Sequence, residues 1–217
     1  MDRIRKQLSR ARFYIILDTQ VQGYPALFKI LKESVRAGEV IVQLRDKFGR
    51  SRDSLRFIQK ALRFLDQNIP FIVNDRVDWA LATGAPGVHL GQDDLPLPVA
   101  RKILGRKVLI GVSCQTLAQA RQAEAGGADY IGFGSVFKTF TKPDRPPMDL
   151  GLLTRVIKAS NIPVYAIGGI TLQNLSRLTD LGVNRVAVTR AVCLSGRVER
   201  TTKFFLERLN SVRIRVQ

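Results

Sequence analysis

The chain has 217 residues, of which 45% are hydrophobic, so it carries enough apolar material for a folded core and is not expected to be disordered. It contains no apolar run close to the ~18 residues that a membrane span needs, and its basic first segment lacks the small-residue cleavage site of a signal peptide. Lys and Arg number 35 against 18 acidic residues, which gives a net charge of +17 and indicates anionic partners.

Short apolar segments alternate with amphipathic segments along the chain. Residues 1–12 read as a basic helix or arm before the first strand. Runs rich in Val and Ile predict eight strands, at residues 13–17, 40–44, 70–73, 87–90, 108–112, 130–133, 164–167 and 185–188. Helical spacing predicts helices at residues 25–37, 51–68, 98–104, 117–125, 150–159, 172–181 and 202–212, with a short helical pattern after the third strand.

Eight strand–helix units in a chain of this length predict an α/β fold, a (β/α)8 TIM barrel. A doubly wound sheet is the alternative, because periodicity alone does not show whether a sheet closes. No linker or shift in composition divides the sequence, so we expect residues 1–217 to form one domain, with residues 1–12 as a basic extension. Cys114 and Cys193 form no motif, which favours a reducing cytoplasm.

The net charge fits two kinds of anionic partner. Small phosphorylated substrates are the first. Nucleic acid is the second, but the basic residues are scattered and aromatic residues are not interleaved with them, so no specific nucleic-acid site is expected. The composition of the source organism is another origin of the charge. The sequence leaves a homo-oligomer open.

Two neighbouring predicted strands end in carboxylates. The third strand stops at Asn74 and Asp75, and the fourth is followed closely by Asp94. In parallel α/β folds the carboxyl ends of the strands form the edge where ligands bind. Carboxylates beside amide groups, with no Cys or His cluster, suit a hard cation, so Asp75 and Asp94 are candidate ligands of Mg²⁺. The alternative is that each aspartate caps the helix that follows it.

Basic and amide side chains follow another strand end and a long loop. The second strand runs into Gln43, Arg45 and Lys47, and Lys142 lies in a proline-rich loop at residues 136–148. These cations form a candidate anion clamp, because Arg grips phosphate oxygens bidentately. Each one alone could be a solvated surface cation. A Schiff-base role for Lys142 is the alternative, but its neighbouring proline favours an exposed lid.

The seventh and eighth strands end in a pattern typical of a phosphate site. Gly168 and Gly169 precede a predicted helix, and Thr189 follows the last strand, as in the usual barrel phosphate site. A plain turn is the alternative for the two glycines. His89 is the only histidine and lies within an apolar run, which favours a packed, hydrogen-bonded role over catalysis and makes a Ser-His-Asp triad or a His-based zinc site improbable.

Six segments together resemble the thiamine phosphate synthase family over residues 13–192. They read VQLRDK, VNDRVDWAL, GVHLGQDDLP, IGVS, GADYIGFGSVFKTFTK and AIGGI. The resemblance implies a transferase of thiamine biosynthesis that joins 4-amino-5-hydroxymethyl-2-methylpyrimidine diphosphate to 4-methyl-5-(2-phosphoethyl)thiazole. The products are thiamine monophosphate and pyrophosphate, and Mg²⁺ assists the departure of pyrophosphate. A carbocation on the pyrimidine methyl carbon is then captured by the thiazole nitrogen.

The resemblance also implies roles for individual residues. Those implied to hold the pyrimidine diphosphate are Gln43, Arg45, Lys47 and Asn74. Those implied to contact the pyrimidine or its diphosphate from later loops are Ser113 and Lys142. Those implied to hold the thiazole phosphate are Thr139, Thr141, Gly169 and the backbone at Thr189 and Arg190. Mg²⁺ is implied at Asp75 and Asp94, and the catalytic set is Arg45, Lys47, Ser113 and Lys142.

Three departures from the family pattern leave alternatives. Thr189–Arg190 stands where the family usually has Val-Ser, so Arg190 either strengthens the phosphate grip or points away. The loop reads GSVFKTFTK in place of GPVFPTPTK, which removes three prolines. Gln115 stands where related thiazole tautomerases use a His, and Gln cannot act as a general acid or base, which disfavours a tautomerase. A non-catalytic sensor of phosphate or thiamine phosphate is the remaining alternative.

Overall fold

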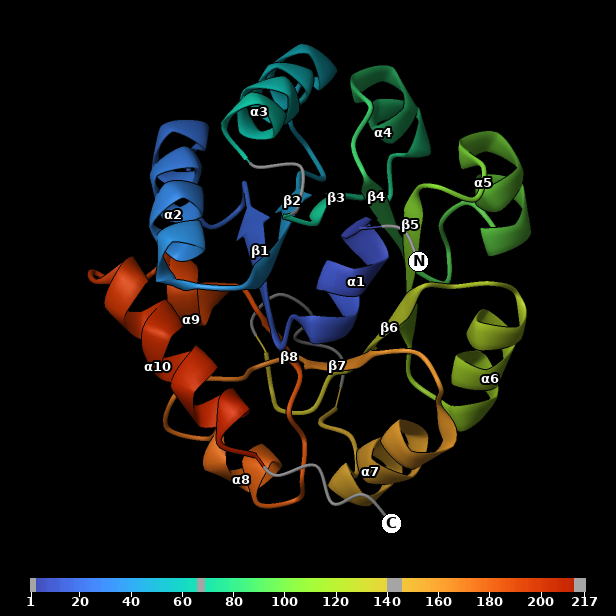
Figure 1. Cartoon of the computed structure of the whole chain (residues 1–217), viewed down its shortest axis with the longest axis vertical. Coiled ribbons are helices and arrows are strands. Elements are labelled where there is room, and N and C mark those ends of the chain that lie inside the picture. The colour runs from blue at the N-terminus through green and yellow to red at the C-terminus, as the bar shows by residue number, and fades with distance from the viewer. Residues whose placement is uncertain (1–2, 66–68, 140–145, 213–217) are drawn as a thin grey trace.

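A computed structural model describes residues 3–65, 69–139 and 146–212 of the chain. Eight parallel strands pair in chain order and close into a barrel, and the described helices other than α1 surround it (Figure 1). The strands are β1 (Phe13–Asp18), β2 (Val40–Arg45), β3 (Phe71–Asn74), β4 (Gly87–Leu90), β5 (Leu109–Cys114), β6 (Tyr130–Gly134), β7 (Val164–Ile167) and β8 (Val186–Val188). Because β1 also pairs with β8, the predicted (β/α)8 barrel is confirmed and the doubly wound sheet is wrong.

The described helices follow the predicted order. They are α1 (Arg3–Arg10), α2 (Tyr24–Ala37), α3 (Ser51–Phe64), α4 (Val77–Thr83), α5 (Leu97–Leu104), α6 (Leu117–Ala125), α7 (Leu150–Ala159), α8 (Ser176–Thr179), α9 (Arg190–Cys193) and α10 (Val198–Asn210). Within the described part of the chain, none of these helices combines the length and the apolar character that crossing a membrane requires.

Almost every strand residue is buried, because the strands are covered on both faces. Side chains alternate between the two faces of a strand. In β1, Phe13 and Ile15 belong to the large apolar cluster between the barrel and its helices. Tyr14 and Ile16 belong to a smaller cluster inside the barrel. The period-two alternation of β1 therefore builds two separate cores from one strand.

Helix α1 closes one end of the barrel. Its Ile4 and Leu8 are buried in the interior cluster, and burial of each stabilises the fold by about 1.5–3 kcal/mol. The Tyr165 hydroxyl inside the barrel donates to the carbonyl oxygens of Leu8 (3.1 Å) and Ala11 (2.8 Å). Figure 1 shows α1 across the barrel opening. The basic segment predicted before the first strand is thus a helix, and it leaves the opposite end for ligands.

The extents of the predicted elements differ most in the last third of the chain. All eight strands agree with their predicted bounds to within two residues. The helix expected at residues 172–181 is wrong in extent, since only Ser176–Thr179 is helical. The Asn174 side chain accepts from Thr171 N (2.8 Å) and donates to the Gly169 carbonyl (2.9 Å), which favours a turn over an earlier helix start. The short helix α9 was not predicted. The predicted helix end at residues 66–68 lies outside the described residues.

Candidate active site

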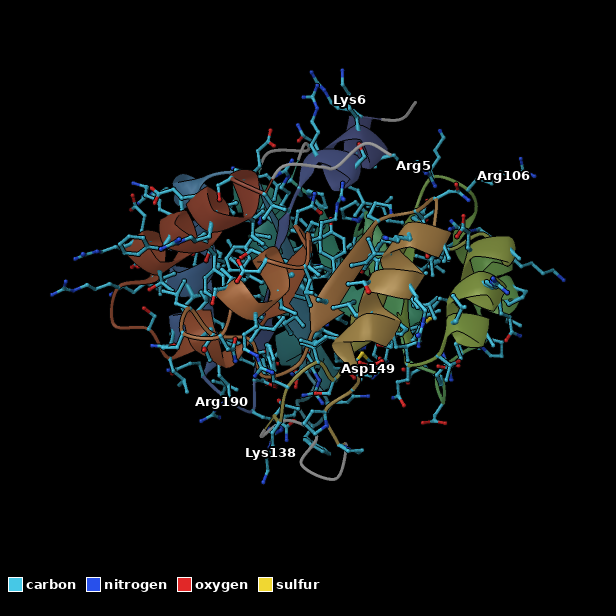
Figure 2. The ribbon with its side chains drawn as sticks, turned by 90° about the horizontal axis from the view of Figure 1, so that it is seen from below. Arg5, Lys6, Arg106, Lys138, Asp149 and Arg190 are labelled. Atoms are coloured by element: carbon cyan, nitrogen blue, oxygen red, sulfur yellow. The ribbon has the colours of Figure 1, made fainter. Side chains whose placement is uncertain are left out.

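A cavity of about 440 Å³ opens at the carboxyl ends of the strands, and residues of all eight strands line it. Its volume suits small molecules. The predicted substrate residues that line it are Gln43, Arg45, Asn74, Ser113, Thr139, Gly169, Thr189 and Arg190. Thr141 and Lys142 lie outside the described residues. Figure 2 shows Lys138 and Arg190 at this end of the molecule, opposite Arg5, Lys6 and Arg106.

Strand β2 carries the first part of the site. The guanidinium of Arg45 donates from Nη1 to the Asp18 carboxylate at 2.7 Å and to the Gln20 side-chain oxygen at 2.8 Å. Asp18 is fully buried at the end of β1, so an ion pair between neighbouring strands holds the Arg45 head in place. Lys47 lies just beyond the strand and pairs with Asp75 of the next loop. The sequence pattern identified Arg45 as a site residue but did not identify Asp18, whose carboxylate holds Arg45 in place.

Asp75 and Asp94 come together as predicted, although 19 positions separate them in the printed numbering. Asp75 has a left-handed backbone, with φ of 60°, which is uncommon for a residue other than glycine. Its amide donates to the His89 carbonyl at 2.8 Å, which fixes the turn after β3. Its carboxyl group is hydrogen-bonded to that of Asp94 and paired with Lys47.

The two carboxyl groups have opposite pKa shifts. Burial, followed by the hydrogen bond with Asp94, raises the pKa of Asp75 to about 6. Burial also acts to raise the pKa of Asp94, but the hydrogen bonds from Asp75 and from Gly91 N (2.7 Å) lower it on balance. The two carboxyl groups therefore share a proton only below about pH 6, and above it a bound cation would relieve the repulsion between them.

The chemistry of this pair fits a hard divalent cation. Neither aspartate caps the following helix, because Arg76 and Pro96 occupy those positions and α4 and α5 have no side-chain cap. No cluster of three or more His, Cys, Asp or Glu exists among the described residues. Mg²⁺ is commonly bound by one or two carboxylates, with water and substrate phosphates completing its ligands, and the pair meets that requirement. The helix-cap alternative is wrong for both residues.

Asp46 has a structural role that the sequence pattern did not reveal. It is buried, although it stands between two residues of the anion clamp. It accepts hydrogen bonds from Thr19 Oγ1, Tyr24 OH, Gly49 N and Ser54 Oγ. Burial acts to raise the pKa of Asp46, but these bonds lower it on balance. Asp46 therefore fixes the loop that presents Lys47.

The glycines after β7 permit a close approach of two loops. Gly168 and Gly169 have φ values of 108° and 63°. A Cβ on Gly168 would lie 2.2 Å from the Ser135 hydroxyl, and one on Gly169 would lie 2.3 Å from the Lys138 carbonyl oxygen. The loop after β6 continues to pair with this turn, through Phe137 N to the Gly168 carbonyl at 3.0 Å. The glycines thus bring the β6 loop and the β7 turn together.

Arg190 and Lys138 add positive charge to the same end of the cavity. Both are exposed at its rim and line it. Whether Arg190 strengthens the phosphate grip or points away stays a prediction. Lys138 was noted only as a departure from the family loop. A basic residue in a loop after a barrel strand was the signal that could have identified it.

His89 is buried and hydrogen-bonded, which confirms the expected packed role. Its Nε2 lies 2.9 Å from Ser113 Oγ, and its Nδ1 lies 3.1 Å from the Tyr130 hydroxyl. His89 also lines the cavity, together with Tyr14. The single histidine is therefore a link between the interior of the barrel and the site.

Comparisons with known proteins identify the family of this chain. Residues 13–192 match the family model described as thiamine monophosphate synthase. The thiamine-phosphate synthase of Gloeobacter violaceus is 43% identical over 211 residues, which cover 95% of this chain and 60% of that protein. The thiamine-phosphate synthase of Ruminiclostridium cellulolyticum is 38% identical, with 89% of this chain and 93% of that protein covered.

A solved structure is also similar over nearly the whole chain. Thiamine phosphate pyrophosphorylase from Pyrococcus furiosus superimposes with a TM-score of 0.83 and 32% identity, covering 96% of this chain and 98% of that one. This chain spans only 60% of the length of the Gloeobacter violaceus relative but nearly all of the other two. The chain therefore belongs to the thiamine monophosphate synthase family and is an enzyme of the transferase class.

Proposed function

We propose that this member of the family joins 4-amino-5-hydroxymethyl-2-methylpyrimidine diphosphate to 4-methyl-5-(2-phosphoethyl)thiazole, and so forms thiamine monophosphate and pyrophosphate. One observation carries the proposal. The cavity is lined by the glycine turn at Gly169 and by Arg45 and Asn74, and next to these two in the chain Lys47 pairs with the Asp75–Asp94 carboxylates. The carboxylates with Lys47 suit a diphosphate with a divalent cation, and the glycine turn suits a phosphate.

On the first side, Arg45 and Lys47 bind oxygens of the pyrimidine diphosphate. Asp75 and Asp94 would hold Mg²⁺, which supplies positive charge that stabilises the departing pyrophosphate. The C–O bond to the pyrimidine methyl carbon breaks, and the electron pair leaves with pyrophosphate. The thiazole nitrogen then donates its lone pair to that carbon. No general base is required, because no proton has to be removed.

On the second side, the thiazole phosphate is bound by the β6, β7 and β8 loops. Gly169, Thr139 and the backbone at Thr189 are proposed to contact its oxygens, and Arg190 adds charge from the rim. Gln43, Asn74 and Ser113 orient the pyrimidine. Arg45, Lys47, Ser113 and Lys142 make up the proposed catalytic set, with Thr141 as a further thiazole phosphate contact.

The test is a reconstitution with defined substrates. Purified protein is incubated with both substrates and Mg²⁺, and thiamine monophosphate and pyrophosphate are measured together. We expect equal amounts of the two products, loss of both with EDTA, and recovery on addition of Mg²⁺. Binding of the substrates without any product would instead support the sensor, and the proposed reaction would be wrong.

We also propose that residues 1–217 form one domain and that the enzyme acts in the cytoplasm. Cys114 and Cys193 are buried free thiols, and burial raises the pKa of each to about 12, which supports a protein that is kept reduced. A homo-oligomer stays a prediction.

A further inference from the structure

A continuous row of hydrogen bonds crosses the interior of the barrel beneath the cavity. Its members come from six different strands, and they are Ser113, His89, Tyr130, Tyr14, Gln43 and Asn74. The successive distances are 2.9, 3.1, 2.9, 2.7 and 2.8 Å. We call this row the interior chain. Five of its six members line the cavity, and only Tyr130, which is fully buried, is not among the lining residues.

The number of hydrogens gives the interior chain one direction. Gln43 Nε2 donates to Asn74 Oδ1, so the other atom of its amide, Oε1, faces Tyr14 and can only accept. The hydroxyl of Tyr14 donates its single hydrogen to Gln43 Oε1. Tyr130 must therefore donate its own hydrogen to Tyr14. Nothing remains on the Tyr130 hydroxyl except lone pairs, and these face His89.

The same count fixes the tautomer of the imidazole. Because the Tyr130 oxygen accepts, Nδ1 of His89 must carry a hydrogen and donate it. In the neutral ring Nε2 is then bare, and it accepts from the hydroxyl of Ser113. The Ser113 hydrogen is thus turned toward His89. Ser113 consequently offers lone pairs to the cavity, while the only side-chain hydrogens of Asn74 lie on its amide nitrogen.

Two glycines make room for the rings of the interior chain. A Cβ on Gly111 would lie 2.0 Å from the Tyr130 ring, and one on Gly132 would lie 3.2 Å from the His89 ring. Burial raises the pKa of Tyr14 and of Tyr130 well above the usual value, so both phenols keep the single hydrogen that the count requires. The space left by the glycines and the protonated state of the two phenols therefore both favour the hydrogen-bond arrangement described above.

We propose that His89, Tyr130 and Tyr14 are positioning residues that determine substrate specificity, because they hold Ser113 as a hydrogen-bond acceptor toward the cavity. The proposal rests on the proposed function and deepens it. The amino group is the only hydrogen-bond donor on the pyrimidine ring of that substrate, and its ring nitrogens are acceptors. An acceptor at Ser113 and an amide donor at Asn74 match this pattern. A ring with a carbonyl in place of the amino group would place the lone pairs of that carbonyl against those of Ser113, and no hydrogen bond would form between them.

The first experiment reads the tautomer without any substrate. His89 is the only histidine in the sequence, so ¹⁵N-histidine labelling gives one unambiguous pair of ring signals in the full chain. We expect the neutral ring with its hydrogen on Nδ1. Tyr130→Phe removes the acceptor, and we expect the hydrogen to move to Nε2. Tyr14→Phe should do the same, because Tyr130 is then free to donate to Nδ1, and it serves if Tyr130→Phe does not fold.

Tyr165→Phe is the matched control. It removes an equally buried hydroxyl from the barrel interior, but this hydroxyl donates to the carbonyls of Leu8 and Ala11 and lies outside the interior chain. We expect the His89 signals of this variant to remain those of the wild type. A change of tautomer in Tyr165→Phe would mean that the ring responds to loss of packing, and the proposal would fail.

The second experiment measures selectivity by calorimetry with Mg²⁺ present. The ligands are the aminopyrimidine diphosphate and its oxo analogue, in which a carbonyl replaces the amino group. We expect the wild type and Tyr165→Phe to prefer the amino compound, and Tyr130→Phe to lower that preference by about tenfold. Loss of affinity for both compounds equally would indicate a merely structural role and overturn the proposal.

The two hypotheses fail separately. If wild-type His89 carries its hydrogen on Nε2 or on both nitrogens, the interior chain runs otherwise and the inference is overturned, whatever the enzyme makes. If the enzyme makes no thiamine monophosphate, the proposed function fails, while the tautomer and its response to Tyr130→Phe still decide the inference.

Discussion

The two sides of the barrel's carboxyl end use different parts of the polypeptide. The loops after β2, β3 and β4 present charged side chains, namely Lys47, Asp75 and Asp94. The loops after β6 and β7 instead pack backbone against backbone, with glycines at the closest points. On the first side a side chain can be replaced without moving the chain. On the second side an added methyl group forces the chain to move.

Neutralising the carboxylate pair should give the largest effect and should leave the fold intact. We expect Asp75→Asn and Asp94→Asn each to lower turnover by about 100-fold, because charge at the proposed Mg²⁺ site is lost. Asn tolerates the left-handed backbone of position 75, so the thermal midpoint should change little. Turnover and melting are measured on the same samples. Near-normal turnover of both variants would remove the metal assignment.

The glycine side should respond in its stability. Gly169→Ala places a methyl group against the Lys138 carbonyl in a left-handed backbone, so we expect the free energy of unfolding to fall by about 3 kcal/mol. Gly182→Ala is the control, because φ is also positive there, at 82°, but its Cβ meets nothing within 4 Å. It should cost about 1 kcal/mol. If urea denaturation gave the same loss in the free energy of unfolding for both variants, the close approach at Gly169 would not contribute to stability.

Asp46 is a third carboxylate on the charged side, and its role is expected to be structural. Asp46→Ala leaves the donors of Thr19, Ser54 and Gly49 without their acceptor, so we expect a loss of about 2 kcal/mol in the free energy of unfolding. Asp53→Ala, a half-exposed carboxylate on α3, should lose less than about 0.5 kcal/mol. If Asp46→Ala instead lowered turnover without changing stability, Asp46 would be assigned as a further metal ligand.

The stability of the charged side should depend on pH in one direction. Burial and Asp94 raise the pKa of Asp75 from 3.8 to about 6, so the folded protein binds this proton more tightly than the unfolded chain does. That contribution is complete below about pH 4 and is lost as the pH rises through about 6. Without divalent cations, we expect wild type to lose about 1 kcal/mol relative to Asp75→Asn between pH 4 and 7. Parallel curves for the two proteins would contradict the raised pKa.

The smallest effect is expected at the rim of the glycine side. Arg190→Ala removes an exposed cation and leaves the backbone in place, so we expect the KM for the thiazole phosphate to rise by about threefold. The KM for the pyrimidine diphosphate is the internal control and should stay constant. An unchanged KM for both substrates would mean that backbone groups alone hold the thiazole phosphate on this side.

Local sequence was a good guide where a strand ends in a charged group. Asp75 and Asp94 were identified because each follows an apolar run, and parallel strands bring such ends to one edge. The same reasoning could not separate Asp46 from its neighbours Arg45 and Lys47. Arg45 ends β2 and the other two follow it, and only the distant donors of Thr19, Tyr24 and Ser54 make Asp46 structural.

The sequence by itself determined the alternation of eight apolar, strand-forming runs with helices, and the residue types that follow those runs. Tertiary structure decided which of these groups meet. The closure of β1 on β8, the plug formed by α1, and the row from Ser113 to Asn74 each join residues that lie far apart in the chain. Such contacts depend on register and on the space left by neighbouring side chains. Local periodicity predicts the type of a helix or strand, but it does not predict which distant residues contact that helix or strand.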